Sequence, residues 1–253
     1  MGTSASSKGR NSSSPLVPPW ADADPAAALP QPEGQRFKGF RTTFGHFVGG
    51  GNVDTLRSAL GKYARVATGG AQVGPRRFGP AYAAGGGLVD LINELNTGGD
   101  GTRATGIDLS GLVGQPIDIA AQEIARALSP ENADADRVAV AILEAIAVAL
   151  PDAEVFDPAL LDDDRLTVLL VEFLSQTLFQ CVTEDADSGW NKAPSERRTI
   201  EAEGQLLDLI RTSLDRHLSP VLANARRPLA RTQIERLQRQ AMEAVWREWE
   251  AFE

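Results

Sequence analysis

Apolar residues recur at helical spacing over most of the chain after residue 88, and this repeat restricts the fold more than any other feature. Within residues 138–149, for example, Val138, Ile142 and Ala145 follow one another at intervals of four and three. Val140 and Val148 occupy other faces of the same segment, so we expect this helix to be central. No stretch alternates apolar and polar residues as a half-buried strand does. The sequence predicts an all-α, bundle-like fold with helices over 88–95, 117–128, 138–149, 162–181, 195–220 and 232–249.

Composition divides the chain into three parts. Residues 1–35 are rich in serine and proline and hold few apolar residues, so they bury too little to offset an ordering cost of about 1–2 kcal/mol per residue. We therefore expect a flexible, disordered N-terminal tail. Residues 36–87 form a basic, glycine- and aromatic-rich segment with one short helix over 53–67, and residues 88–253 form an acidic helical domain.

Charge is distributed unevenly along the chain. Residues 1–90 contain ten lysines and arginines against five acidic residues, whereas the remainder contains 15 against 29. A basic front and an acidic body favour docking to a partner, or of the chain on itself, over uniform nucleic-acid binding. The single cysteine and the serine-rich, non-apolar start predict a cytoplasmic protein.

The basic segment is the one region that resembles a nucleic-acid surface, because its phenylalanines lie among cations. The alternative, which we favour, is that these aromatic residues anchor the segment to the helical core while the charges face solvent. No recognised nucleic-acid-binding motif is present. The candidate contacts are Arg36, Lys38, Arg41, Arg76 and Arg77.

No catalytic or metal-binding pattern emerges. His46, His217 and Cys181 lack the spacing of metal ligands. The aspartates at 162–164 precede a helix, where capping is favoured over cation binding. The glycine runs at 49–51 and 85–87 lack the strand and the Lys-Ser/Thr pair of a phosphate loop. We therefore predict a non-enzymatic protein without metal or cofactor.

The N-terminus offers a different chemistry. A residue as small as Gly2 favours removal of Met1, which leaves a free α-amine with a pKa of about 7.7–8.0. Thr3 and Ser4 are small enough to enter a partner's active site. The prolines and tryptophan at 18–20 form a segment that is suited to docking, with a plain linker as the alternative. N-myristoylation also fits this start formally and is the least favoured alternative.

Several stretches resemble one known family. They are MGTSASSKG with PLVPPWADAD, RFKGFRTTFGHF with LRSALGKYARVATGG, and ALPDAEVFDPALLDDDRLTVLLVEFLSQTLFQCV with WNKAPSERR. They are similar to the B component of the Qat (QatABCD) antiphage-defence systems. The resemblance implies three neighbours: an ATPase component, a QueC-like 7-cyano-7-deazaguanine synthase and a TatD-like nuclease. Within the last stretch, Lys192 and Pro194 belong either to a partner surface or to a turn that begins a helix.

These features together suggest a hypothesis about Gly2. Synthases of that type activate a carboxylated deazaguanine with ATP, and ammonia then attacks the activated carboxyl. The α-amine of Gly2 could replace ammonia and give a covalent deazaguanine adduct. Thr3 and Ser4 would then be recognised by the synthase, with Pro18, Pro19 and Trp20 docking the tail. The alternative is a nucleic-acid-binding adaptor that brings DNA to the nuclease through residues 36–77.

Overall fold

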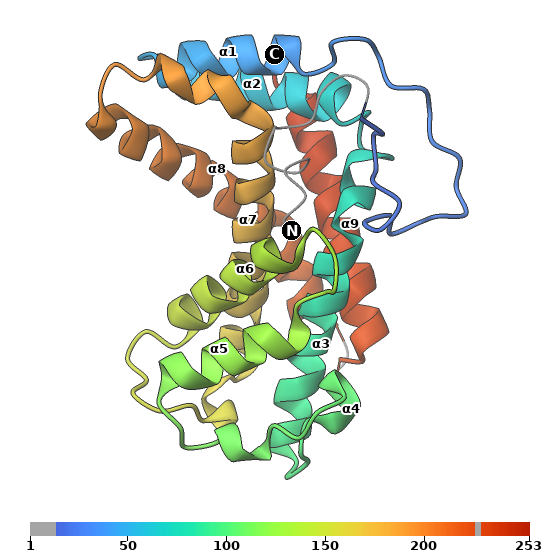
Figure 1. The fold of residues 1–253 in the computed structure, drawn as a ribbon, viewed down its shortest axis with the longest axis vertical. Helices are drawn as coiled ribbons and strands as arrows, with labels where there is room; N and C mark the ends of the chain where they lie inside the picture. Colours follow the sequence, from blue (N-terminus) through green and yellow to red (C-terminus); the bar gives the residue numbers. More distant parts are fainter. Residues whose placement is uncertain (1–13, 226–228) are drawn as a thin grey trace, which may run out of the picture. The chain divides into compact units, whose positions relative to one another are not determined.

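The computed structural model describes residues 14–225 and 229–253, which form α-helices, short 3-10 and π segments and irregular connections, with no β-strand (Figure 1). The all-α prediction is confirmed. The helices are α1 (Lys38–Val48), α2 (Val53–Lys62), α3 (Gly79–Asn96), α4 (Thr102–Thr105), α5 (Ile117–Leu128), α6 (Ala135–Ala149), α7 (Asp163–Ala186), α8 (Glu196–Ala223) and α9 (Arg231–Glu250). Gly2, Thr3 and Ser4 lie outside the described residues.

The basic segment contains more helix than the sequence predicts. Helix α1 occupies a stretch that we expected to be irregular, and α3 begins at Gly79 rather than at residue 88. In α1, Phe40, Phe44 and Phe47 lie three or four positions apart and are fully buried, so packing outweighs the glycines around them. The buried phenylalanines confirm that the aromatic residues anchor this segment to the core. The expectation that its charges face solvent is wrong for Arg36, Arg76 and Arg77, which are buried.

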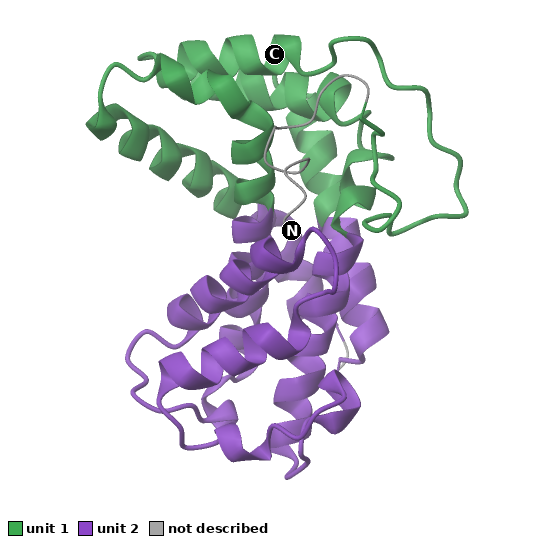
Figure 2. Cartoon of the chain, viewed as in Figure 1, with its two compact units in different colours: residues 1–78, 178–213, 242–253 green, residues 79–177, 214–241 purple. Residues whose placement is uncertain are grey.

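The chain divides into two compact units, each built from separate stretches of sequence (Figure 2). Unit 1 comprises residues 1–78, 178–213 and 242–253, and unit 2 comprises residues 79–177 and 214–241. These boundaries differ from the division at 35 and 87 that composition suggests. Composition follows the chain in order, whereas compact units are defined by packing between distant segments.

Unit 1 is organised around aromatic side chains. Helix α1 packs against α2 and against the 3-10 turn η5 (Asp187–Lys192). The rings of Phe40 and Tyr63 lie 4.9 Å apart, and Trp246 stacks on Trp249 at 5.5 Å. The indole of Trp246 donates to the Thr68 hydroxyl at 2.9 Å. The polar atom of this buried ring is therefore satisfied, as burial requires.

Unit 2 is built on α3, which contacts α4, α5 and α6, while α5 and α6 also pack on each other. The glycine run at 85–87 permits close packing of α3 on α9, because a Cβ at Gly85 would lie 2.2 Å from Gln238 Oε1. The amide of Gln238 donates to the Tyr82 carbonyl at 3.1 Å. The run is thus a helix-packing feature.

Helix α6 differs from expectation in its burial. Val140 and Val148 are 44% and 42% exposed, so the prediction of a helix buried on all faces is wrong. Its inner face does carry the predicted residues, since Val138, Ile142 and Ala145 are buried. Valine also occurs on protein surfaces, so its presence on a second face of the helix does not establish that this face is buried.

Helix ends follow the predicted chemistry with one exception. Asp162 Oδ1 accepts from the Arg165 amide at 2.9 Å, which confirms the capping interpretation. Ser195 Oγ accepts from the Arg198 amide at 3.3 Å at the start of α8. Pro220 does not end α8, however, because the helix continues to Ala223. A proline this close to a C-terminus disturbs only the last turn.

One segment, Asp163–Lys192, is long and apolar enough to cross a membrane by length and composition. Buried residues make up 67% of its most apolar window, as expected of a helix that forms part of a core.

Candidate functional site

The N-terminal strap, which we define as residues 14–27, lies against unit 1 instead of extending freely. Leu16 and Val17 are 4% and 2% exposed and form a cluster with Val73. Gly69 has a φ of +83°, and a Cβ there would lie 3.2 Å from Leu16 Cδ1. The amide of Ala21 donates to the Pro18 carbonyl at 3.0 Å and closes a turn. For these residues, the expectation of disorder is wrong.

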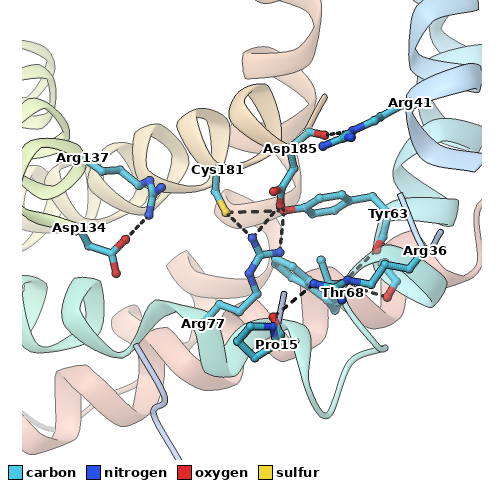
Figure 3. Close-up of polar contacts among 12 residues, drawn as sticks. Pro15, Arg36, Arg41, Tyr63, Thr68, Arg77, Asp134, Arg137, Cys181 and Asp185 are labelled. Carbon is cyan, nitrogen blue, oxygen red and sulfur yellow. Dashed lines mark hydrogen bonds and ion pairs between the residues drawn. The ribbon is translucent and has the colours of Figure 1, made fainter. Parts of the chain in front are cut away.

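Arg36 holds the beginning of the strap. Its guanidinium donates from Nη1 to the Ser14 carbonyl at 2.6 Å and from Nη2 to the Pro15 carbonyl at 3.2 Å (Figure 3). The side chain is buried, and its Cζ lies 4.9 Å from the centroid of the Phe37 ring. Because the acceptors are backbone carbonyls, this contact fixes the path of the chain whatever side chains stand at 14 and 15.

Arg76 holds the rest of the strap. Its Nε and Nη2 donate to the two carboxylate oxygens of Asp22 at 2.9 and 2.7 Å, a bidentate pair that is almost fully buried. Nη2 also donates to the carbonyls of Asp24 and Ala27 at 2.7 and 2.8 Å. The Arg76 carbonyl in turn accepts from the Ala23 amide at 2.9 Å. The strap is therefore fixed at two places.

Arg77 lies in a buried polar cluster of unit 1. Figure 3 shows its guanidinium beside Asp185, Tyr63 and Cys181. Nη2 is 2.7 Å from Asp185 Oδ2 and 3.3 Å from Cys181 Sγ, and Nη1 donates to the Tyr63 hydroxyl at 3.2 Å. The same hydroxyl donates to Asp185 Oδ2 at 3.0 Å. Helix α7 thus supplies an acid and a thiol to a cation from η2 (Gly74–Phe78).

Burial and charge act in opposite directions on this cluster. Burial by itself lowers the pKa of Arg77, but Asp185, Cys181 and Tyr63 together outweigh it and hold the pKa of the guanidinium above its usual value. Burial raises the pKa of Tyr63 well above its usual value, and Arg77 only partly opposes that rise. The phenol therefore stays protonated and remains a donor to Asp185.

These interactions determine which of the five candidate nucleic-acid-binding residues are accessible. Arg36, Arg76 and Arg77 are 2%, 4% and 4% exposed and are engaged inside unit 1, so they present no charge to a phosphate. Arg41 is half-buried, with Nε donating to the Asp185 carbonyl at 2.8 Å and Nη1 lying 3.4 Å from Asp187. Lys38 alone of the five is exposed. The predicted cationic surface at residues 36–77 is wrong for three of its five members.

The predicted docking residues of the tail are arranged around the turn of the strap. Pro18 is buried, while Pro19 is exposed and Trp20 is 53% exposed. The neighbouring residues hold the turn in place, since Ala21 is 1% exposed. An indole ring on a fixed turn is therefore presented to solvent.

The turn at Trp190–Pro194 is packed on α1. The ring of Trp190 meets Phe44 edge-on at 4.9 Å, and its Nε1 donates to the Thr183 carbonyl at 3.2 Å. Lys192 lies against α1 as well, since a Cβ at Gly45 would be 3.1 Å from its Cγ. These contacts favour a turn that begins α8 over a partner surface.

Sequence reasoning missed Asp22, Tyr63 and Asp185, which are the partners of the buried arginines. Asp185 lies 108 positions from Arg77 and Asp22 lies 54 positions from Arg76, so no local pattern joins them. Among residues 14–225 and 229–253, no group of histidine, cysteine or acidic side chains is arranged to hold a metal ion.

The model of one protein family, described as Qat anti-phage system associated protein QatB, matches residues 69–249, which is more than half of the chain. The chain belongs to the QatB family. It is accordingly a component of a bacterial antiphage-defence system. The matched range contains Arg76, Arg77 and Asp185, whereas the strap and Arg36 precede it. No curated protein and no solved structure matches the chain.

Proposed function

We propose that this QatB-family protein is a non-catalytic, cytoplasmic component of its defence complex and the substrate of a QueC-like synthase that conjugates a deazaguanine to Gly2. The single observation that carries the proposal is the fixed strap. Arg36 holds the chain at Ser14, so the position of the chain twelve residues after Gly2 is fixed. A substrate that is presented from a fixed point has a higher effective concentration at a partner's active site than one on a free chain.

The covalent chemistry needs only the amine of this chain and the partner's own reactants. ATP activates the carboxyl group of a 7-carboxy-7-deazaguanine as an acyl adenylate, with release of pyrophosphate. The α-nitrogen of Gly2 attacks the acyl carbon, the C–N bond forms and AMP leaves with the electron pair of the broken C–O bond. The amine proton passes to solvent. The product is an amide, and no oxidant or reductant is consumed.

The number of residues between Gly2 and Ser14 limits how far the amine lies from the fixed point. Gly2 lies twelve positions before Ser14. An extended chain spans at most about 3.3–3.6 Å per residue, so the covalent chain keeps the amine within about 40 Å of Ser14. The small residues Thr3 and Ser4 next to it impose little steric demand on an active site that must enclose the acyl adenylate.

Trp20 supports the proposal as a docking residue. Tryptophan contributes more than most residues at protein interfaces when it fills a pocket, and here its backbone is already fixed by the turn at Pro18. A synthase that binds Trp20 would hold the strap on one side of its active site while the tail enters. In this proposal the helical body contacts the ATPase component, and the TatD-like nuclease is a further member of the complex.

The nucleic-acid adaptor is not carried forward, because it depends on arginines that are engaged inside unit 1.

Intact-protein mass spectrometry tests the proposal directly. The chain is purified from cells that express it with all of its operon partners, without the synthase, or alone. We expect a mass gain equal to the carboxylated base less one water, confined to the N-terminal peptide and dependent on the synthase. An unmodified, Met-less chain in the presence of every partner would contradict the proposal.

Two variants sharpen this experiment. Gly2→Leu should abolish the adduct, because a large second residue prevents removal of Met1 and displaces the acceptor amine. Gly9→Leu makes the same change seven positions later in the tail and should leave the adduct in place. Equal loss of the adduct in both variants would show that the reaction depends on the composition of the tail and not on its terminal amine.

A further inference from the structure

Two short segments of unit 2 run antiparallel beside each other, and Pro116 and Val155 form an isolated bridge between them. Three backbone hydrogen bonds lie next to this pair: the Ile117 amide donates to the Glu154 carbonyl at 3.0 Å, the Phe156 amide to the Gln115 carbonyl at 2.8 Å, and the Gly114 amide to the Phe156 carbonyl at 2.8 Å. In an antiparallel ladder, pairs that exchange hydrogen bonds alternate with pairs that do not. The amide and carbonyl of Val155 therefore point away from residues 114–117.

The outer edge at Val155 is open. Its amide and carbonyl make no hydrogen bond to any residue within 14–225 or 229–253. The residue is half-exposed, and buried main-chain polar groups are nearly always paired, so these two groups face solvent. A main-chain edge with an unpaired donor and acceptor can pair with an extended segment of another chain, the mode of binding known as strand addition.

Apolar side chains lie near this edge. Helices α5 and α6 pack side by side and are joined by residues 129–134, so the end of α6 lies near the start of α5, which follows Pro116 directly (Figure 1). Four apolar residues that are 42–48% exposed therefore gather at this end of the hairpin, and we call them the hairpin-end surface: Val113, Ile119, Val148 and Val155.

The charge around the hairpin-end surface has one sign. Residues 107–119 and 148–157 contain five acidic residues and no lysine, arginine or histidine. Among these, Asp118, Asp152 and Glu154 are exposed, and their carboxylates make no ion pair or hydrogen bond with another residue that the structure describes. Such a surface attracts cations and repels the phosphates of nucleic acids and of anionic lipids. A partner that fits it is a protein with basic and apolar side chains.

We propose that the Val155 edge binds an extended, cationic segment of a partner protein as an added strand. Main-chain hydrogen bonds to Val155 fix the segment, and its apolar side chains cover Val155 and Ile119. Its lysines or arginines pair with Asp118, Asp152 and Glu154. An extended segment is favoured over a helix, because a helix has no main-chain groups left to pair with an edge. Binding of this kind requires no modification of the N-terminus.

A synthetic peptide tests the edge on the full chain. The probe is a fluorescein-labelled heptapeptide of alternating lysine and valine, and its binding is followed by fluorescence anisotropy. The matched control peptide carries N-methyl groups on two consecutive central residues, which removes donors from both of its edges and keeps every side chain. We expect saturable binding of the first peptide and binding weaker by about tenfold or more for the second, since two main-chain hydrogen bonds are lost. Amide exchange at residues 153–157 should slow when the first peptide is bound.

Two pairs of substitutions separate this surface from general attraction to an acidic unit. Asp152→Asn with Glu154→Gln should weaken binding about fivefold, as expected for the loss of two exposed charge pairs. Glu131→Gln with Asp136→Asn makes the same change in charge at the other end of the hairpin, about 18 Å away along α5, and should leave the affinity unchanged. Far-UV circular dichroism should be the same for both variants and the unaltered chain.

Equal affinity for the two peptides would overturn strand addition. Equal weakening by the two pairs of substitutions would overturn the assignment to the hairpin-end surface, because the peptide would then respond only to the net charge of unit 2. Absence of saturable binding by the unmodified peptide would overturn the proposal as well. None of these results bears on conjugation at the N-terminus, which is measured separately by intact mass.

Discussion

Replacement of Arg77 by methionine tests whether the buried cluster stabilises the fold through its ion pair. Methionine keeps much of the side-chain volume but removes the hydrogen bonds to Asp185, Tyr63 and Cys181. Asp185 is 2% exposed, so its carboxylate would remain buried after losing its ion-pair partner. Breaking a buried pair in this way costs about 3–5 kcal/mol. That cost is a large share of a typical unfolding free energy of about 5–15 kcal/mol.

Urea unfolding followed by tryptophan fluorescence is a suitable assay, because Trp246 lies 6.2 Å from Tyr63 within the same unit. Arg57→Met provides the matched control. Arg57 pairs with Asp54 at 3.4 Å, and both side chains are exposed, so this change should cost less than about 1 kcal/mol. The comparison separates burial of the pair from loss of a positive charge.

A double variant separates the cost of leaving the Asp185 carboxylate unpaired from the cost of lost side-chain packing. Arg77→Met combined with Asp185→Leu removes both charges, and it should recover a large part of the stability that the single change loses. If Arg77→Met unfolds within about 1 kcal/mol of the unaltered chain, the reasoning from the buried pair is refuted. If the double variant is no more stable than the single one, the cost arises from packing and not from an unpaired carboxylate.

Three further outcomes are expected. Because the folded-state pKa of Tyr63 is raised, stability should fall with rising pH above about 10, where the unfolded phenol releases its proton first; Tyr63→Phe should lack this component in alkaline urea titrations. Gly85→Ala should cost about 1–3 kcal/mol in thermal or urea unfolding, since its Cβ would collide with Gln238, whereas Gly204→Ala, with open space around it, should be neutral or stabilising. Arg76→Met should speed amide exchange between residues 21 and 27 in hydrogen-exchange mass spectrometry, and unchanged exchange would show that the Asp22 pair does not hold the strap.

The helices that the sequence predicts well are those whose apolar repeat is uninterrupted. The repeat predicts a helix over 117–128, and α5 is Ile117–Leu128. Ser195 also precedes α8 as expected. In these segments, local propensity, capping chemistry and burial all favour the same structure, so tertiary packing has nothing to override.

The strap and the arginines show where local reasoning fails. An arginine among aromatic residues has the same local sequence whether it faces a phosphate or a buried carboxylate. The buried position of Arg77 depends on its ion pair with Asp185 on α7. That of Arg36 depends on backbone carbonyls, which leave no signal in the sequence. Likewise, Leu16 and Val17 are too few to predict an ordered segment, and their burial depends on contacts with Val73 and Gly69, which are distant in sequence.

The distribution of charge also depends on which distant segments pack together, and this distribution bears on function. By position, the first 90 residues carry a net charge of +5, which suggests a basic module. By compact unit, the result is different. Unit 1 holds 15 basic and 15 acidic residues, because the acidic segments 178–213 and 242–253 return to it, while unit 2 holds 10 and 19.

All of the net charge of −9 therefore belongs to unit 2, and the unit that carries the strap is neutral. A neutral unit in which Arg36 and Arg76 are buried has little electrostatic attraction for a nucleic-acid backbone, whose binding depends on released counterions. The same inward arginines hold the strap in place. Arg36 and Arg76 at the front of this chain thus hold the strap, which presents the ring of Trp20 to solvent.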